Sequence, residues 1–412
     1  MEHSTDIIQS SSTLQLSMQV HEELERWKAV KFPVPIPDYG FSEPNKILQK
    51  EVYTYAKEDN FNALFGLLSD KRDRVSSEEV LDIIFKHVAA SGNSLLHVAA
   101  SNGGEGVTQL LCHHFPLLIT RKNFLGDNAL HLAARAGLFD TIQNLVKHVK
   151  IHNRTLELAS LLRMKNNKGN TPLHDAVSMG FLSGASLLVS RCPVAASQRN
   201  EEGNLPIHVA CQKGHLEVVR ELLPYWLDPM DFLNEKGQNI LHVAAGSGKM
   251  TIVDGILGNQ DLEALINEKD YDGNTPLHLA AMYCRSDIVR ALASDERVDK
   301  RIVNNEKLKP SGVVAKLLQG GRFKAPKSDG MRKVLQVLVK ADDMAEFDIN
   351  LISNLPRTTL TTEQLNRGIG NLLVVSVLVV GVVKISNALP QPPQLQPPLL
   401  QPPVKENREY NG

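Results

Sequence analysis

Cysteine is scarce in this sequence, and the few copies follow no pairing pattern. Four occur among 412 residues, at Cys112, Cys192, Cys211 and Cys284. No two of them have CxxC spacing, so the sequence predicts neither a disulfide framework nor a zinc site. A reducing, intracellular setting is expected, and no metal is expected.

An excess of charge of either sign is also missing. The chain carries 45 Lys and Arg against 46 Asp and Glu, for a formal net charge of −1. Proteins that bind nucleic acid present a clustered basic face to the phosphates. No such face is evident here, so no nucleic-acid partner is expected.

Catalytic motifs are absent as well. The nearest approach to a phosphate-binding loop is Gly-Ser-Gly-Lys at 246–249. Val243 stands where the first glycine of that loop belongs, and Met250 stands where Ser or Thr belongs. The chain has no kinase motif set and no RING-type cysteine pattern. We therefore expect no enzyme, no catalytic residue and no cofactor.

What the sequence does contain is one phrase repeated six times. Its clearest copy is Asn-Thr-Pro-Leu-His-Leu-Ala-Ala at 274–281. The steps between the histidines of successive copies are 34, 43, 34, 34 and 36 residues. A period of about 33 with Thr-Pro-Leu-His-x-Ala is the ankyrin signature. The sequence thus predicts an all-α repeat solenoid, an ankyrin stack of helix-turn-helix units joined by hairpin loops.

Each position of the phrase has a physical role. Thr or Asn can cap the first helix, and Pro is tolerated in its first turn. The paired alanines let helices approach closely. Six residues after the histidine comes a glycine, expected to end the helix in a left-handed turn, except in the sixth copy, which has Cys284. An aliphatic residue returns fourteen positions after each histidine and is expected to anchor the second helix.

Six histidines at one motif position invite a metal or catalytic interpretation. Successive copies belong to different repeats, so they cannot converge on one ion. We interpret them as structural residues, each buried in its own hydrogen-bonded turn. They are His97, His131, His174, His208, His242 and His278.

Composition divides the chain into five parts. We expect a disordered N-terminal arm at 1–46 and a repeat domain at 47–320, with six clear repeats between degenerate caps. A connector at 321–368 follows, then a candidate transmembrane helix at 369–389. The tail at 390–412 is rich in proline and is expected to be disordered.

The most apolar run in the chain is short. It extends from Leu372 to Val383. A membrane span needs about 20 residues, which this run reaches only if Asn371, Lys384 and Asn387 are included. Insertion into a bilayer and packing against the repeats therefore both remain open.

The repeats and the phrase Gly-Asn-Leu-Leu-Val-Val-Ser-Val-Leu-Val at 370–379 together resemble plant membrane ankyrin proteins of the accelerated-cell-death type. In that family, four membrane helices usually follow, with a Pro-Gly-Gly motif after the first. Here the match stops near Val380, so the chain resembles a member with a truncated membrane domain. The resemblance implies plant defence or stress signalling at the plasma membrane or an endomembrane, with the repeats in the cytoplasm.

The predicted function is that of a scaffold that binds other proteins through the concave face of the stack. Large side chains at the hairpin tips and just after the alanine pairs are the candidate contacts. They are Phe124, Arg135, Met179, Tyr271, Met282 and Tyr283. Packing against a neighbouring repeat is the alternative role for each. The rival functions are a soluble cytosolic or nuclear regulator and a component of a channel-like, multi-span assembly.

Overall fold

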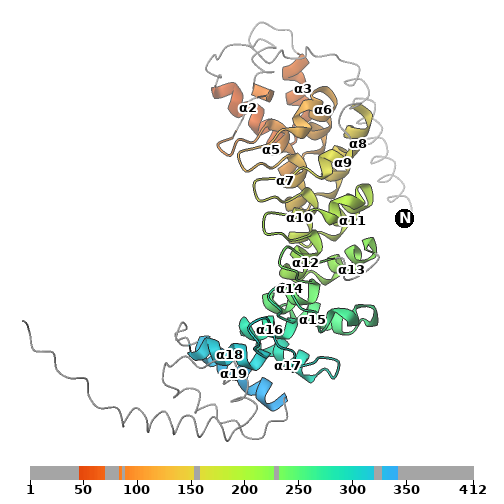
Figure 1. Cartoon of the computed structure of the whole chain (residues 1–412). Coiled ribbons are helices and arrows are strands. Elements are labelled where there is room, and N and C mark those ends of the chain that lie inside the picture. Colours follow the sequence, from red (N-terminus) through yellow and green to blue (C-terminus); the bar gives the residue numbers. More distant parts are fainter. Residues whose placement is uncertain are drawn as a thin grey trace, which may run out of the picture.

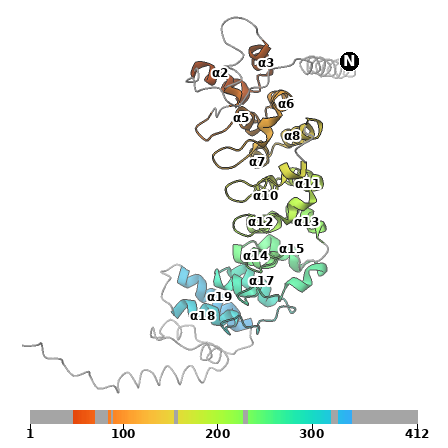
Figure 2. The ribbon, with the colours of Figure 1, turned by 45° about the horizontal axis from the view of Figure 1, so that its top comes forward.

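The computed structural model describes residues 46–69, 83–85, 89–152, 158–226, 232–319 and 327–341. Within these ranges every regular element is a helix. The helices stack in two rows that follow a curved path, and hairpin loops project from the concave side (Figure 1). A second view shows the loops of successive repeats side by side (Figure 2). The predicted all-α repeat solenoid is confirmed.

The inner row lies beside the hairpin loops, and the outer row lies behind it (Figure 1). The inner row consists of α2 (Lys46–Lys57), α5 (Leu95–Asn102), α7 (Ala129–Ala136), α10 (Pro172–Ser178), α12 (Pro206–Lys213), α14 (Ile240–Ser247), α16 (Pro276–Met282) and α18 (Pro310–Gln319). The outer row consists of α3 (Phe61–Ser69), α6 (Glu105–His114), α8 (Phe139–His152), α11 (Leu182–Arg191), α13 (Leu216–Leu222), α15 (Met250–Leu257), α17 (Ser286–Ser294) and α19 (Lys327–Ala341). Each helix contacts its partner in the same repeat and its counterpart in the next.

Shorter elements complete the outer side. They are α9 (Leu158–Leu162) and the 3₁₀ helices η1 (Pro116–Thr120), η2 (Pro193–Ser197), η3 (Leu223–Tyr225) and η5 (Gln260–Leu265). α9 belongs to the longest of the six repeats and packs between α8 and η2.

The glycine six residues after each histidine ends its helix as predicted. Gly103, Gly137, Gly180, Gly214 and Gly248 have positive φ angles, from 71° to 92°. In the sixth repeat Cys284 takes the left-handed conformation instead, with φ of 58°. Left-handed backbone is costly for a side chain with a Cβ. The turn between the two helices is therefore imposed by the stack even where glycine is missing.

The core runs the length of the stack between the two rows. The paired alanines are fully buried, as Ala99 and Ala100 illustrate at 0% exposure. The aliphatic residues fourteen positions after the histidines are buried too; they are Leu111, Leu145, Leu188, Leu222, Ile256 and Leu292. Burial of a side chain of this size contributes about 2 kcal/mol, so this position holds the outer helices to the inner ones.

The C-terminal end of the stack lies further along the chain than residue 320. α18 takes the inner-row place, with Gly312 where a histidine would stand. α19 packs against α17 and α18 and buries Leu335, Leu338 and Val339. This part of the predicted connector therefore forms the outer helix of a last repeat. The stack extends to Ala341.

Several predicted segments lie outside the described residues. These are the arm up to residue 45, the end of the connector at 342–368, the candidate membrane helix at 369–389 and the tail at 390–412. Among the helices that the structure describes, none is both long enough and apolar enough to cross a bilayer.

Candidate functional site

The repeated histidine joins two repeats. Its Nδ1 lies against the residue that caps its own helix, for example 2.8 Å from the Thr275 hydroxyl in the case of His278. The Thr275 backbone N–H donates to the same nitrogen at 3.2 Å. On the other side of the ring, Nε2 lies 3.0 Å from the Leu308 carbonyl of the following repeat. Because Nδ1 accepts the backbone proton, Nε2 carries the ring proton and donates it to this carbonyl.

Burial keeps these histidines neutral. Desolvation lowers the pKa of His174, His208 and His278 to about 4. Their hydrogen bonds to backbone carbonyl groups raise the pKa, but desolvation is the larger effect. It also lowers the pKa of His131 and His242. Each of the five side chains holds the one tautomer that bridges two repeats. The structural interpretation of the motif agrees with this geometry.

A second connection between repeats was not predicted. The hairpins begin with an asparagine eight residues before the histidine position, and its side chain turns the loop. In Asn234, Oδ1 accepts the N–H groups of Lys236 and Gln238 at 2.9 and 3.0 Å. Its Nδ2 donates to Asn204 Oδ1 of the preceding repeat at 3.1 Å. The same inter-repeat bond forms from Asn123, Asn166, Asn200 and Asn304.

Asp270 occupies this position in the sixth repeat, and the direction of the bond reverses there. A carboxylate cannot donate, so Gln238 Nε2 donates to Asp270 Oδ2 at 3.3 Å. Together these contacts form an amide ladder, defined by the side chains at the starts of the hairpins and their partners one repeat back. The ladder and the histidines hold the hairpins in fixed register.

The hairpin tips also contact one another directly. The Tyr271 N–H donates to the Lys236 carbonyl at 3.0 Å. A Cβ on Gly237 would lie 2.4 Å from the Tyr271 ring, so glycine leaves room for this side chain on the previous tip. Gly92 makes the same room for Phe124. The tips thus form a rigid edge along the concave side.

Four of the six predicted contact residues are exposed. Tyr271 is 69% exposed and Phe124 is 63% exposed, both at hairpin tips. Met179 and Tyr283 are each 56% exposed, at the ends of α10 and α16. Leu125, beside Phe124, is 58% exposed and was not predicted. Large apolar side chains at these positions are available to a partner.

The other two predicted residues are engaged within the stack. Met282 is half-buried against Leu308, Val313 and Ala315 of the last repeat. Arg135 is half-buried, and its guanidinium lies 3.0 Å from Asp127 and 2.8 Å from Asp175. Both residues therefore have the packing role that was the alternative for each candidate.

A family model described as ankyrin repeats (3 copies) matches in overlapping segments that run from residue 56 to residue 304. This is more than half of the chain. The chain belongs to the ankyrin repeat family.

Among solved structures, the chain is similar to the ankyrin repeat domain of Bcl-3, described as a unique member of the IkappaB protein family. The sequences are 21% identical, and the TM-score is 0.45. The match covers 60% of this chain and 99% of that domain. No curated protein sequence matches the chain.

One buried cluster of the ankyrin stack has the composition of a metal site. Ligand atoms of Asp127, His131 and Asp175 lie within 4.8 Å of one another. The guanidinium of Arg135 lies against both carboxylates, and His131 Nε2 is bonded to the Asn170 carbonyl at 2.9 Å. The chain thus supplies its own cation here, and we assign no metal to the cluster.

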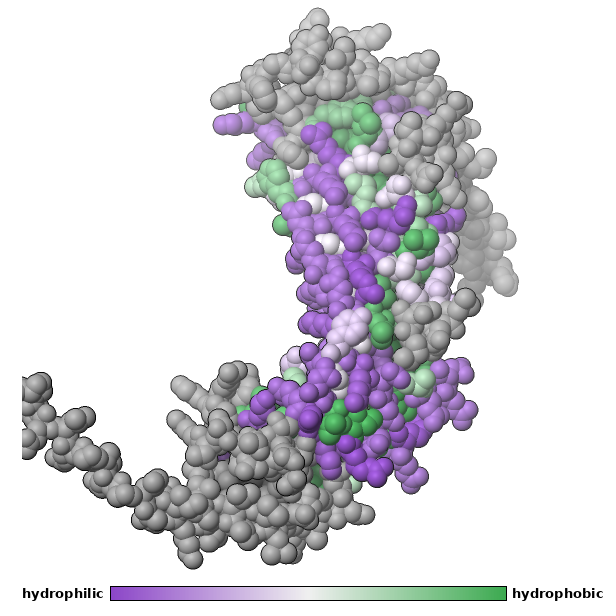
Figure 3. Space-filling model, in the orientation of Figure 1, coloured by the Kyte–Doolittle hydropathy of each residue, from purple (hydrophilic) through white to green (hydrophobic). Residues whose placement is uncertain are grey.

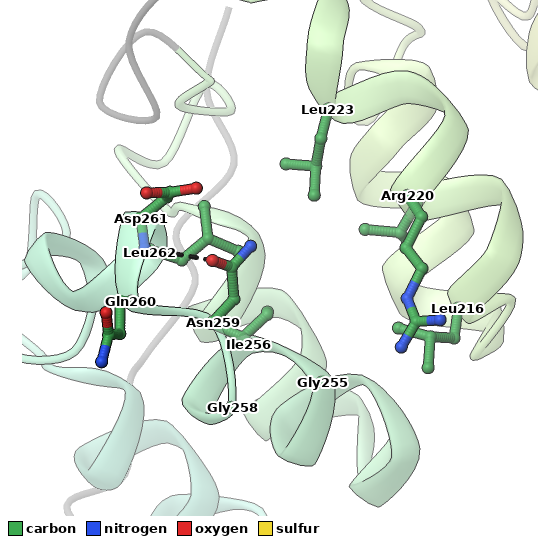
Figure 4. Close-up of a pocket in the computed structure, with 11 residues that line it drawn as sticks. Leu216, Arg220, Leu223, Gly255, Ile256, Gly258, Asn259, Gln260, Asp261 and Leu262 are labelled. Atoms are coloured by element: carbon green, nitrogen blue, oxygen red, sulfur yellow. Dashed lines mark hydrogen bonds between the residues drawn. The ribbon is translucent and has the colours of Figure 1, made fainter.

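A groove of about 460 Å³ lies on the outer side, between α13 and α15 (Figure 4). Leu216, Leu223 and Leu262 give it an apolar lining, with Arg220 and Asp261 on opposite sides. No cysteine, histidine, serine or lysine lines it. Elsewhere in the stack, burial raises the pKa of the Cys112 and Cys211 thiols, which keeps them protonated. Neither feature supplies an activated nucleophile.

Proposed function

We propose that this ankyrin protein is an interaction scaffold whose concave surface binds other proteins. The observation that carries the proposal is the exposure of Tyr271 and Phe124 at hairpin tips and of Met179 and Tyr283 at the ends of the inner-row helices α10 and α16. Aromatic side chains are enriched among the residues that dominate binding energy. The histidines and the amide ladder hold the hairpins in fixed register, so the hairpin backbone should lose little conformational entropy on binding.

Comparative partner capture tests this proposal. We expect Tyr283→Ala to reduce the amount of specific partner protein retained, because it removes an exposed aromatic anchor. Leu117→Ala is the matched control: Leu117 is 66% exposed but lies in η1 on the outer side. Equal retention by the wild type and both variants would contradict the use of the inner surface.

We propose further that the scaffold is tethered to a membrane through 369–389, in plant defence or stress signalling. The support is the apolar run from Leu372 to Val383 and the resemblance of 370–379 to the start of the first membrane helix of the accelerated-cell-death family. The ankyrin stack would then face the cytoplasm.

Alkaline carbonate extraction of the full chain, beside a chain ending at Gly368, tests the tether. If only the full chain stays in the membrane pellet, the segment inserts. Release of both chains would favour the soluble cytosolic regulator, in which Leu372–Val383 packs against the stack. The channel-like assembly requires more spans than this sequence contains, unless the chain oligomerises.

A further inference from the structure

The hairpin tips of the fourth to sixth repeats carry an unusual concentration of carboxylates. We define the acidic ridge as Glu201, Glu202, Glu235 and Asp272, all exposed at consecutive tips. Lys236 is the one cation at the same three tips, so their formal charge is 1 − 4 = −3. A hydrophilic strip follows the hairpin side of the middle of the stack (Figure 3).

The ridge differs from the tips on either side of it. In the second and third repeats the exposed tip residues are Phe124, Leu125, Asn167 and Lys168, with no carboxylate among them. In the last repeat Glu306 is neutralised by Lys316, whose Nζ lies 2.9 Å from the Glu306 carboxylate. Among the hairpin tips that the structure describes, unpaired carboxylates are therefore confined to the fourth to sixth repeats.

The part of the chain that the structure describes supplies no paired counter-charge to the ridge carboxylates. Within the described residues, no ion pair forms at Glu201, Glu202, Glu235 or Asp272. Glu202 accepts one hydrogen bond, from the Asn204 amide at 3.1 Å. Like charges held on neighbouring tips repel one another, and a cationic partner removes that repulsion.

An exposed aromatic ring stands within this ridge. Tyr271 precedes Asp272 at the tip of the sixth repeat and leans over Gly237, two residues after Glu235. Its backbone is fixed on both sides: its N–H donates to the Lys236 carbonyl at 3.0 Å, and its carbonyl accepts from Asn305 Nδ2 at 2.9 Å. A guanidinium stacks on such a ring by a cation–π contact and can pair with a carboxylate at the same time.

From these observations we infer that the partner segment seated on the fourth to sixth repeats is basic and contains arginine. One arginine stacks on Tyr271 between Glu235 and Asp272, and further cationic side chains meet Glu201 and Glu202. Arginine is preferred over lysine because its planar guanidinium both stacks and binds carboxylates in two-point fashion. This inference rests on the proposed scaffold function and specifies the chemistry of its partner.

Selection from a random-sequence peptide library against the immobilised full chain tests the inference. We expect the retained peptides to be enriched in arginine, and enriched more in arginine than in lysine. A synthetic peptide of the enriched sequence should lose affinity about tenfold or more for Glu235→Lys/Asp272→Lys, and its affinity should fall with rising salt. Glu263→Lys, an exposed carboxylate in η5 on the outer side, is the matched control and should change affinity little.

The outcomes distinguish a failure of the basic-partner inference from a failure of the proposed scaffold function. Retained peptides that are acidic or uncharged, and lose affinity with Tyr283→Ala, would overturn the basic-partner inference and leave the scaffold intact. A basic peptide that binds both the ridge variant and the control as tightly as the wild type would also overturn it. If no substitution on the inner surface weakens the binding of any retained peptide, the proposed scaffold function is contradicted as well. Tyr271→Phe retains the ring and should preserve binding, whereas Tyr271→Leu should not.

Discussion

The histidine of each repeat acts through both of its ring nitrogens, one inside its own repeat and one on the next. Only the first of these contacts could be expected from the sequence, because it lies three residues away, at the cap of the same helix. The second partner of His97 is the carbonyl of Asp127, thirty residues along the chain. Because every residue has a backbone carbonyl, this acceptor cannot be recognised from residue types. Only the packed structure identifies it.

The depressed pKa values predict the pH dependence of stability. Below the ordinary histidine pKa of about 6.5, the unfolded chain binds protons at His174, His208 and His278, whereas the folded chain binds them only near about 4. The stack is therefore expected to keep full stability above about pH 6.5 and to lose it as the pH falls towards 4. Each of the three histidines contributes roughly 1.4 kcal/mol per pH unit within that window.

Urea denaturation between about pH 7 and about pH 5 measures this slope. His208→Gln removes one titrating group. The slope of the free energy of unfolding against pH should therefore be smaller in this variant by the contribution of one histidine. An unchanged slope in this variant, in a protein that still unfolds cooperatively, would contradict the role assigned to His208.

The hairpin is the element at which sequence interpretation was incomplete. The repeat pattern predicted hairpin loops between the helical units, and such loops are present. An asparagine recurs eight residues before most of the histidines, and this period is the signal in the sequence for the amide ladder. Asp270 breaks that period, and Gln238 compensates for it from the neighbouring hairpin. A compensation between separate hairpins becomes evident only once the two are side by side.

Removal of one ladder residue should destabilise the stack strongly. Asn234→Ala deletes bonds to Lys236, Gln238 and Asn204 at a site that is 3% exposed. Leaving these polar groups buried without partners should cost about 3 kcal/mol, measured by chemical denaturation. Asn305→Ala removes one bond, to the Tyr271 carbonyl, at an exposed tip, and should cost less than about 1 kcal/mol. Equal losses in the two variants would show that the ladder is not structural.

Substitutions at two glycines distinguish the cost of backbone strain from the cost of a side-chain clash. Gly137 and Gly237 have φ angles of 73° and 71°, but only at Gly237 would a Cβ meet a neighbour, the ring of Tyr271. Either substitution by alanine should cost about 1 kcal/mol for the left-handed backbone. Gly237→Ala should cost more and should also displace the Tyr271 ring, which tyrosine fluorescence can follow. A larger loss for Gly137→Ala would contradict this assignment.

At the scale of the whole molecule, the phrase that occurs in six repeats was enough to predict the architecture. Each copy favours the same two helices and the same turn. The end of the stack was harder to place. α19 has the apolar face of an outer helix but no motif, so the sequence alone assigned it to a connector. The concave surface depends on the curvature of the entire stack, and the distinction between the exposed Tyr283 and the half-buried Met282 follows from how the last repeat packs on α16.

That neighbouring pair offers the most direct test of the central claim, that the inner surface binds proteins through exposed anchors. For one captured partner, the dissociation constant and the melting temperature are measured on the same preparations of the wild type, Tyr283→Ala and Met282→Ala. We predict that Tyr283→Ala weakens binding about tenfold with the melting curve nearly unchanged, whereas Met282→Ala lowers the melting temperature. A large loss of stability in Tyr283→Ala, with affinity retained, would place Tyr283 in the core and contradict the account.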